Sequence, residues 1–162
     1  MRLYVIRHAH AGTRGSAMDD IERPLSPKGH QQAADLAALF DQSEITRVLS
    51  SPAVRCVQTV APLAQSHNLE VDTHDDLWET AQSSHTMALL NQANEPGLAI
   101  CSHGNTIPPI IEQMARDGAQ IRGRGCEKAS VWVVERAESK WERATYVSTG
   151  AKSLNWSDRL ER

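Results

Sequence analysis

Three short apolar runs, each followed at once by polar or basic residues, constrain the fold of this chain more than any other feature. The runs are 3–6, 48–49 and 98–101, and the pairs that follow them are Arg7-His8, Ser50-Ser51 and Ser102-His103. Runs this short predict buried strands rather than helices. Segments of helical character separate them, which predicts an α/β fold with a mainly parallel central sheet and helices on both faces.

Two serine-proline pairs predict where helices begin. Ser26-Pro27 and Ser51-Pro52 each combine a capping hydroxyl with a proline that suits the first helical turn. A helix is therefore expected from each pair, and the second helix should carry Arg55 in its first turn. Pro62 is expected to kink or end that second helix. Further helices are expected over 86–93 and 106–116.

The remaining segments are expected to be edge strands, a loop and a tail. Residues 69–73 alternate weakly and predict a strand, while 130–134 and 143–147 predict two β segments that pair as a hairpin. The polar stretch 10–23 predicts a loop. Because residues from 148 onward are polar and largely without pattern, we expect one domain over 1–147 and a mobile C-terminal tail over 148–162.

Composition narrows the classes of function. A chain of 162 residues fits one domain, and its net charge of −3 argues against nucleic acid polymers and anionic membranes as partners. No apolar run approaches the roughly 20 residues of a membrane helix, and the N-terminus lacks the features of a signal peptide. We therefore expect a cytoplasmic protein. Its three cysteines are far apart and predict neither a disulfide framework nor a zinc site.

Basic and imidazole side chains follow several of the predicted strands. Because ligands of such sheets bind beyond the carboxyl ends of the strands, we expect Arg7, His8, Arg55 and His103 to meet at one edge. Two guanidiniums present planar forks of donors that suit phosphate oxygens, and each charged hydrogen bond contributes roughly 1.5–3 kcal/mol. The pattern predicts a phosphoryl-binding site.

This set of residues is suited to nucleophilic phosphoryl transfer. One histidine can attack phosphorus in line, and the other can donate to an oxygen on which negative charge develops. An alkoxide leaving group also needs a general acid. Glu79 is a candidate because the negative charge of a nearby phosphate would favour its protonated form. The alternative is that Glu79 is an exposed glutamate at the start of a helix.

Several motifs resemble those of the histidine phosphatase superfamily, which has the phosphoglycerate-mutase-like fold. Arg7-His8-Ala9 resembles its RHG motif, and Ser102-His103-Gly104 resembles its second histidine motif. Three further segments agree in order: 23–26 with Gly29 (RPLS…G), 50–59 (SSPAVRCVQT) and 77–79 (LWE). The resemblance extends along nearly the whole chain.

The resemblance implies roles for these residues. His8 would be the nucleophile that becomes phosphohistidine, and Glu79 would be the proton donor. Arg7, Arg55 and His103 would bind the phosphoryl group together with His8. The resemblance also implies that neither a metal nor another cofactor is required.

Two departures from the family pattern narrow the branch. Alanine replaces glycine after His8, as in small members similar to bacterial phosphohistidine phosphatases of the SixA type. About two dozen residues separate Glu79 from His103, where mutases carry a long helical insertion. Its absence implies an open site, a bulky substrate and hydrolysis. Three sets of residues also look like the phosphatase half of actinobacterial MutT-type two-domain hydrolases: 7–12, Asp19-Asp20 with 23–25, and 101–104. The candidate substrates are therefore a phosphohistidine protein and a nucleoside phosphate or other small phosphorylated metabolite.

Two other classes of function stay open at this point. A metal-dependent phosphohydrolase could use His8, His10, Asp19 and Asp20, although neighbouring arginines would oppose a cation. A non-catalytic module of the same fold could bind phosphate without turnover.

A basic rim is a further expectation. Arg14 and Arg23 are candidates to contact the rest of the substrate, and Lys28, Arg122, Arg124 and Lys128 could extend the rim. Scattered surface charge is the alternative reading for these residues. Nothing in the sequence indicates an oligomeric state.

Overall fold

The computed structural model describes residues 1–14, 19–40 and 45–149. The predicted C-terminal tail at 148–162 lies outside these residues except for Ser148 and Thr149. None of the helices that the structure describes is long and apolar enough to cross a membrane.

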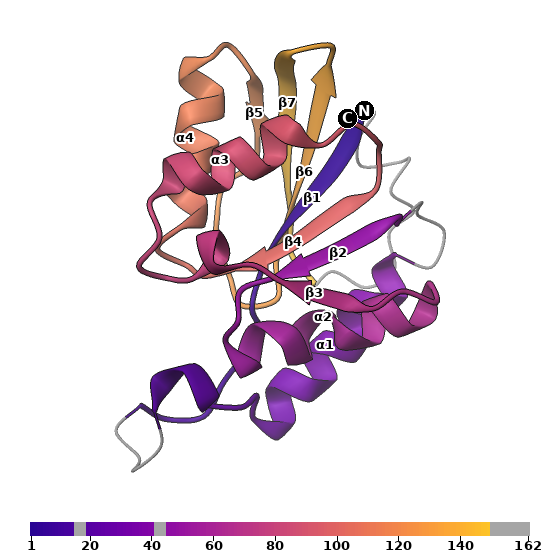
Figure 1. Cartoon of the computed structure of the whole chain (residues 1–162), viewed down its shortest axis with the longest axis vertical. Coiled ribbons are helices and arrows are strands. Elements are labelled where there is room, and N and C mark those ends of the chain that lie inside the picture. Colours follow the sequence, from indigo (N-terminus) through magenta and orange to yellow (C-terminus); the bar gives the residue numbers. More distant parts are fainter. Residues whose placement is uncertain (15–18, 41–44, 150–162) are drawn as a thin grey trace.

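A single mixed sheet runs through the described part of the chain (Figure 1). Its seven strands are β1 (Arg2–Arg7), β2 (Arg47–Ser50), β3 (Val71–Thr73), β4 (Leu98–Ser102), β5 (Gln120–Arg122), β6 (Val131–Ala137) and β7 (Lys140–Val147). They lie in the order β3-β2-β4-β1-β6-β7-β5. Only the pairings of β6 with β1 and with β7 are antiparallel, so the sheet is mainly parallel, as predicted.

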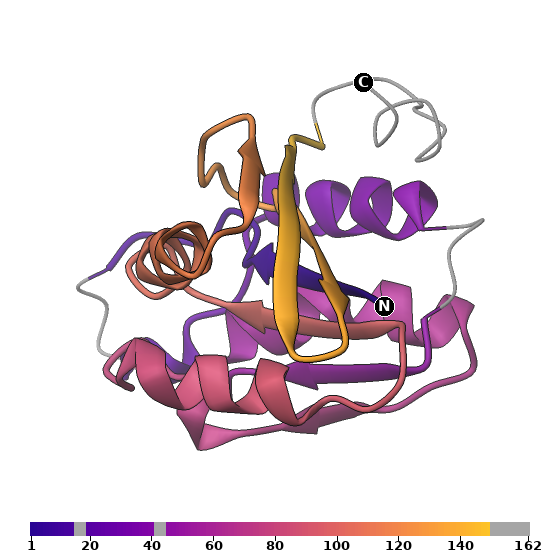
Figure 2. The ribbon, with the colours of Figure 1, turned by 90° about the horizontal axis from the view of Figure 1, so that it is seen from above.

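Helices cover both faces of the sheet (Figures 1 and 2). They are α1 (Pro27–Leu39), α2 (Val54–Ser66), α3 (Ser83–Gln92) and α4 (Ile107–Arg116), with short 3-10 turns η1 (Asp20–Glu22) and η2 (Asp75–Leu77). Because successive strand side chains point to opposite faces, β1 contributes to two cores. Tyr4 and Ile6 pack in the core that α1 and α2 cover, whereas Leu3 and Val5 pack in the core under α3 and α4.

Helix α1 begins as the sequence predicts. Ser26 is its N-cap, Pro27 is its first residue, and the Ser26 hydroxyl accepts a hydrogen bond of 3.1 Å from the Gly29 amide. This bond satisfies one of the amides that a helix start leaves without an intrahelical partner.

Helix α2 begins later than predicted, and it does not end at Pro62. It begins at Val54 after Ala53, three residues beyond Ser51, and its N-cap makes no side-chain hydrogen bond. The Ser51 hydroxyl instead contacts a histidine across the sheet edge, as described below. The helix also continues through Pro62 to Ser66. Leu63, which follows the proline, is fully buried. Its packing favours a longer helix by more than the loss of the one backbone hydrogen bond that Pro62 cannot donate.

The predicted hairpin is confirmed as β6 and β7, but the sequence reading missed β5. That strand has only three residues, none of them fully buried, and it pairs with β7 at one edge of the sheet. So short and polar a segment carries no periodic signal.

The sheet register brings the predicted site segments together. Arg7 of β1 lies opposite Ser102 of β4, and Ser50 of β2 lies opposite Cys101 of β4. These three strands are neighbours and parallel, so their carboxyl ends meet at the same edge. The segments that follow them begin within one small region, as expected for ligand sites in such sheets.

Candidate active site

His8 lies directly after β1 and is almost completely buried. Its Nδ1 is 2.8 Å from the carbonyl oxygen of Ala9, which can only accept, so Nδ1 donates a hydrogen. The neutral ring therefore keeps a free lone pair on Nε2. The backbone is also held: the His8 amide donates to Ser102 O at 3.0 Å, and the Ala129 amide donates to His8 O at 3.2 Å.

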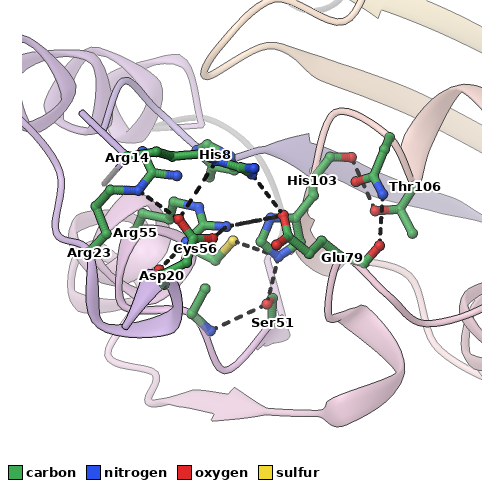
Figure 3. A network of polar contacts seen from close by, with 12 residues as sticks. His8, Arg14, Asp20, Arg23, Ser51, Arg55, Cys56, Glu79, His103 and Thr106 are labelled. Carbon is green, nitrogen blue, oxygen red and sulfur yellow. Dashed lines mark hydrogen bonds and ion pairs between the residues drawn. The ribbon is translucent and has the colours of Figure 1, made fainter. Parts of the chain in front are cut away.

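His103 follows β4 and faces His8 edge-on, with the ring centroids 5.4 Å apart. The Ser51 hydroxyl lies 2.8 Å from His103 Nε2 (Figure 3). Nδ1 is the nitrogen on the side of Arg55, at 3.4 Å from its Nη2. The Trp78 ring packs edge-on against the imidazole at 5.2 Å. These contacts fix the ring in one orientation.

Arg55 occupies the first turn of α2, as predicted, and is fully buried. Its Nη1 donates to the Asp20 carbonyl at 2.7 Å, and its Nη2 lies 3.2 Å from Asp20 Oδ2 and 3.4 Å from Glu79 Oε2. Its guanidinium lies over the Trp78 ring. Two carboxylates therefore compensate a charge that burial alone would make costly.

Arg7, at the end of β1, donates from Nη1 to the carbonyl of Cys126. Its guanidinium packs against Gly104, where an added Cβ would lie 2.7 Å from Arg7 Cζ. The Nε atoms of Arg7 and Arg55 are buried and have no hydrogen-bond partner among the described residues. Donors left in this state favour an acceptor such as an anion.

Glu79 lies in the same polar network rather than at a helix start. Its Oε2 is 3.3 Å from Arg14 Nη2 and 3.9 Å from His103 Nδ1, in addition to the Arg55 contact (Figure 3). The Asn105 amide donates to the Glu79 carbonyl at 2.7 Å. The structure thus places Glu79 next to Arg55 and His103, the two side chains that the sequence analysis assigned to the same site.

Asp20 joins the arginines across the site. Besides the Arg55 contact, its Oδ1 is 3.0 Å from Arg23 Nε and 3.7 Å from Arg14 Nε. Desolvation would raise its pKa, but the hydrogen bond from Arg23 and the charges of Arg55, Arg23 and Arg14 lower it below its usual value. Asp20 is therefore an anion that orders the basic groups.

A pocket of about 640 Å3 lies over these residues. The residues that line it come from the ends of β1 and β4 and from loops: Arg7, His8, Ala11, Gly12, Arg14, Arg23, Glu79, Thr80, His103, Gly104, Asn105 and Lys128. Of the predicted rim, Arg14, Arg23 and Lys128 line the pocket, whereas Lys28, Arg122 and Arg124 do not. Arg23 is buried, and it bonds to Asp20 and to the Gly12 carbonyl, so it also orders the loop.

The residues of the metal-site alternative do not gather into one cluster. His10 Nδ1 lies 2.6 Å from the Ser26 hydroxyl, and Asp20 pairs with arginines. Within residues 1–14, 19–40 and 45–149, no group of three His, Cys, Asp or Glu side chains could hold a metal ion.

Burial controls the charge of both pocket imidazoles. Desolvation lowers the pKa of His8 to about 3 against the opposing Ala9 hydrogen bond, with help from Arg55, Lys128 and Arg7. Desolvation and the Arg55 charge lower the pKa of His103 to about 3 as well. Both rings are therefore neutral at pH 7, and His8 Nε2 keeps its lone pair.

Three contributors to the site were missed or assigned another role from the sequence. Ser51 was expected to cap a helix at the sheet edge. Asp20 was a possible metal ligand and part of a segment that resembles one subgroup of the family. Lys128 was one of several candidates for a basic rim. The SSP segment and the paired aspartates were visible signals, but their partners lie far away in sequence. No local pattern identifies Lys128.

The sequence comparisons agree with this geometry. Residues 3–87 match the model of the histidine phosphatase superfamily (branch 1), so the chain belongs to that superfamily. An 8-oxo-(d)GTP phosphatase of Mycolicibacterium smegmatis is 34% identical over 152 residues, which cover 89% of this chain and 47% of the relative. The chain thus spans about half the length of that relative.

Solved structures show the same fold. A protein from Agrobacterium tumefaciens assigned as the phosphohistidine phosphatase SixA superposes with a TM-score of 0.74 at 22% identity, covering 91% of this chain and 97% of that one. The protein histidine phosphatase SixA complexed with tungstate gives 0.71 at 21% identity, covering 91% and 95%. The chain therefore has the phosphoglycerate-mutase-like histidine phosphatase fold.

Proposed function

We propose that this protein is a metal-independent phosphatase that acts through a covalent phosphohistidine on His8. The observation that carries the proposal is the state of that imidazole: Nδ1 donates to Ala9 O, so a neutral Nε2 is available inside a basic pocket. Arg7, Arg55 and His103 surround it and are the residues that would bind the phosphoryl group.

In the first step His8 Nε2 attacks phosphorus, and the bond from phosphorus to the leaving group breaks. Glu79 gives its proton to the departing oxygen. His103 Nε2 lies 2.8 Å from the Ser51 hydroxyl. With that hydroxyl as the donor, Nδ1 would carry the hydrogen and would donate it to an oxygen of the transferring group. The Nε donors of Arg7 and Arg55, for which the described residues provide no acceptor, would bind other oxygens of that group.

In the second step water attacks phospho-His8. One proton of that water passes to bulk solvent, orthophosphate leaves, and the lone pair returns to Nε2. Glu79 takes its own proton back from solvent before the next cycle. Nδ1 stays bonded to Ala9 O in both steps, so the ring needs no change of orientation. Low pKa values in the free site suit this cycle, because no proton has to leave His8 before attack.

The substrate is bulky, and two classes fit the open pocket: a phosphohistidine protein and a nucleoside phosphate. No residue of α3 lines the pocket in the described chain, so this helix does not cover the site. The named relatives support both classes, since one is a SixA protein histidine phosphatase and another is an 8-oxo-(d)GTP phosphatase.

Trapping the intermediate tests the proposal. Quenching during turnover of a 32P-labelled substrate should leave acid-labile, base-stable label on residue 8, and His8→Ala should carry none. Rapid hydrolysis without label on residue 8 would reject the mechanism.

A substrate screen separates the competing classes. Nucleotides, sugar phosphates and phosphohistidine proteins are incubated with and without chelator, with His8→Ala as the blank. Activity should be unchanged in chelator. Loss of activity in chelator would favour the metal-dependent alternative, and phosphate binding without turnover of any substrate would favour the non-catalytic module.

A further inference from the structure

Lys128 has no partner for its charge among the residues that the structure describes. It lines the active-site pocket and is half-buried, and no hydrogen bond or ion pair to it is found within the described parts of the chain. Arg14, Arg23 and Arg55 differ in this respect, since Arg14 and Arg23 pair with Asp20 and Arg55 pairs with both Asp20 and Glu79. Arg7 donates to the Cys126 carbonyl. Lys128 is thus a cation that the protein places in the pocket without neutralising it.

The loop that carries Lys128 is held rigidly against the nucleophile. The next residue, Ala129, is fully buried with φ of 61°, a left-handed conformation that costs energy for alanine. Its amide donates to the His8 carbonyl. On the other side, Cys126 O accepts from Arg7, and the Glu127 amide donates to the Tyr146 hydroxyl at 3.1 Å. The backbone on both sides of Lys128 is therefore tied to the site.

The charges around the pocket exceed what one phosphoryl group needs. Among the described residues, five cationic side chains line the pocket or pair across it, and two carboxylates oppose them: Arg7, Arg14, Arg23, Arg55 and Lys128 against Asp20 and Glu79. Both histidines are neutral. A phosphate monoester brings about two negative charges, and a second esterified phosphate adds about one more.

We propose that Lys128 binds the phosphate adjacent to the transferred one, so the substrate class is a terminal phosphoanhydride such as a nucleoside diphosphate. The inference rests on the proposed function and narrows its substrate. His8 Nε2 attacks the terminal phosphorus, the bond to the bridging oxygen breaks, and that oxygen leaves with the electron pair as part of the nucleoside monophosphate. Lys128 is placed to stabilise the charge that this leaving phosphate gains. Burial and the charges of Arg7, Arg23, Arg55 and Arg14 lower the pKa of Lys128, consistent with a cation that lacks an anion.

The test compares substrates that differ by one phosphate. Wild-type enzyme should show a kcat/KM for GDP at least about tenfold above that for GMP, because one charged hydrogen bond is worth roughly 10- to 100-fold. Lys128→Met should remove most of this preference while changing kcat/KM for GMP less than about threefold. Lys128→Arg should retain part of it. Lys140→Met, at an exposed lysine remote from the pocket, is the matched control and should change neither value.

Several outcomes would overturn the proposal. The proposal is wrong if the wild-type kcat/KM for GDP does not exceed that for GMP. It is also wrong if Lys128→Met lowers kcat/KM equally for GDP and GMP, because Lys128 would then contact the transferred group. Phosphoserine is a further arm, since it carries a carboxylate in place of the second phosphate. If it matches GDP and depends equally on Lys128, the subsite is for carboxylates.

A binding measurement keeps the inference testable without turnover. Calorimetry of His8→Ala with pyrophosphate and orthophosphate should show tighter binding of pyrophosphate, and His8→Ala/Lys128→Met should lose the difference. This readout does not depend on a phosphohistidine. Failure of the mechanism at His8 and failure of the Lys128 subsite would therefore give different results. Equal affinity for the two anions in His8→Ala would reject the subsite.

Discussion

At the residue scale, two neutral imidazoles in a basic pocket are the feature on which the chemistry depends. His8 and His103 are 5% and 2% exposed, and water is therefore not available to solvate their protonated forms. Nearby guanidiniums act in the same direction. Both rings are consequently uncharged at neutral pH, as the proposed mechanism requires, and folding stability should carry the cost of keeping them so.

Stability should fall on acidification through the ordinary histidine range. The folded pKa values are about 3 and the unfolded value is about 6.5, so between these limits the unfolded state binds more protons. Lowering the pH from 7.5 to 5.5 should cost about 1 kcal/mol for each of the two histidines. Denaturant titration at the two pH values measures this change. His103→Gln should show a smaller pH dependence than wild type, and an unchanged dependence would contradict the assignment.

Glu79 should matter only for poor leaving groups. Glu79→Gln removes the proposed proton donor, so ester hydrolysis should fall by about 100-fold or more. Phosphohistidine hydrolysis should be spared, because transfer from one imidazole to another is nearly balanced. Steady-state kinetics on p-nitrophenyl phosphate, an alkyl phosphate and a phosphohistidine protein separate these effects.

Equal losses on the ester and the phosphohistidine substrate would refute this division of roles. They would indicate instead that Glu79 positions Arg55 and Arg14, its two partners in the network. Circular dichroism of the variant is the control for folding.

At the element scale, α1 supports the segment that follows the nucleophile. The Ser26 amide donates to His10 O at 3.0 Å, and Gly29 lies against the same carbonyl so closely that an added Cβ would overlap it. Close approach, rather than backbone conformation, is what requires glycine here. The first turn of the helix thus holds the loop that begins after His8.

Gly29→Ala should destabilise the protein by about 1–3 kcal/mol, because the helix and the loop must separate to accommodate the methyl group. An alanine at an ordinary helix position would stabilise instead. Gln31→Ala, on the exposed surface of the same helix, is the control and should change the free energy of unfolding little. Urea titrations of both variants provide the comparison; a stable Gly29→Ala would show that the loop moves freely.

At the scale of the whole molecule, the buried Arg136 connects strand β6 to the C-terminal end of helix α3. Arg136 of β6 donates to the carbonyls of Leu90 and Asn91 at 3.0 and 2.9 Å, and also to that of Ala93. These carbonyls lie at the C-terminal end of α3, where a helix leaves acceptors without intrahelical partners. One guanidinium therefore attaches α3 to the antiparallel part of the sheet.

Arg136→Met should lower the free energy of unfolding by about 2–3 kcal/mol, since it leaves buried carbonyls without donors. Activity should persist below the melting temperature, because Arg136 does not line the active-site pocket. Arg143→Met is the control. Arg143 forms a partly exposed ion pair with Glu135, so its loss should lower the free energy of unfolding by less than about 1 kcal/mol. Thermal melts and assays on the same samples distinguish a stability effect from a catalytic one.

Much of this protein could be predicted from its sequence because the signals are local. Period and length identified the principal strands, Ser26-Pro27 marked the start of α1, and the residues following the apolar runs identified Arg7, His8 and His103. Parallel strands share a carboxyl edge whatever their loops do, so convergence followed from the pattern alone. Arg55 was also located, although its helix begins later than Ser51.

Tertiary structure decided the contacts between residues that are distant in the sequence. The Ser51 hydroxyl contacts His103, 52 positions away, so it does not begin α2. Asp20 accepts a hydrogen bond from Arg55, and the segment before β6 brings Lys128 into the pocket that His8 also lines. Periodicity reports only which face of an element is apolar. Which side chain receives each hydrogen bond depends on how the elements pack, and that is settled only when the chain folds.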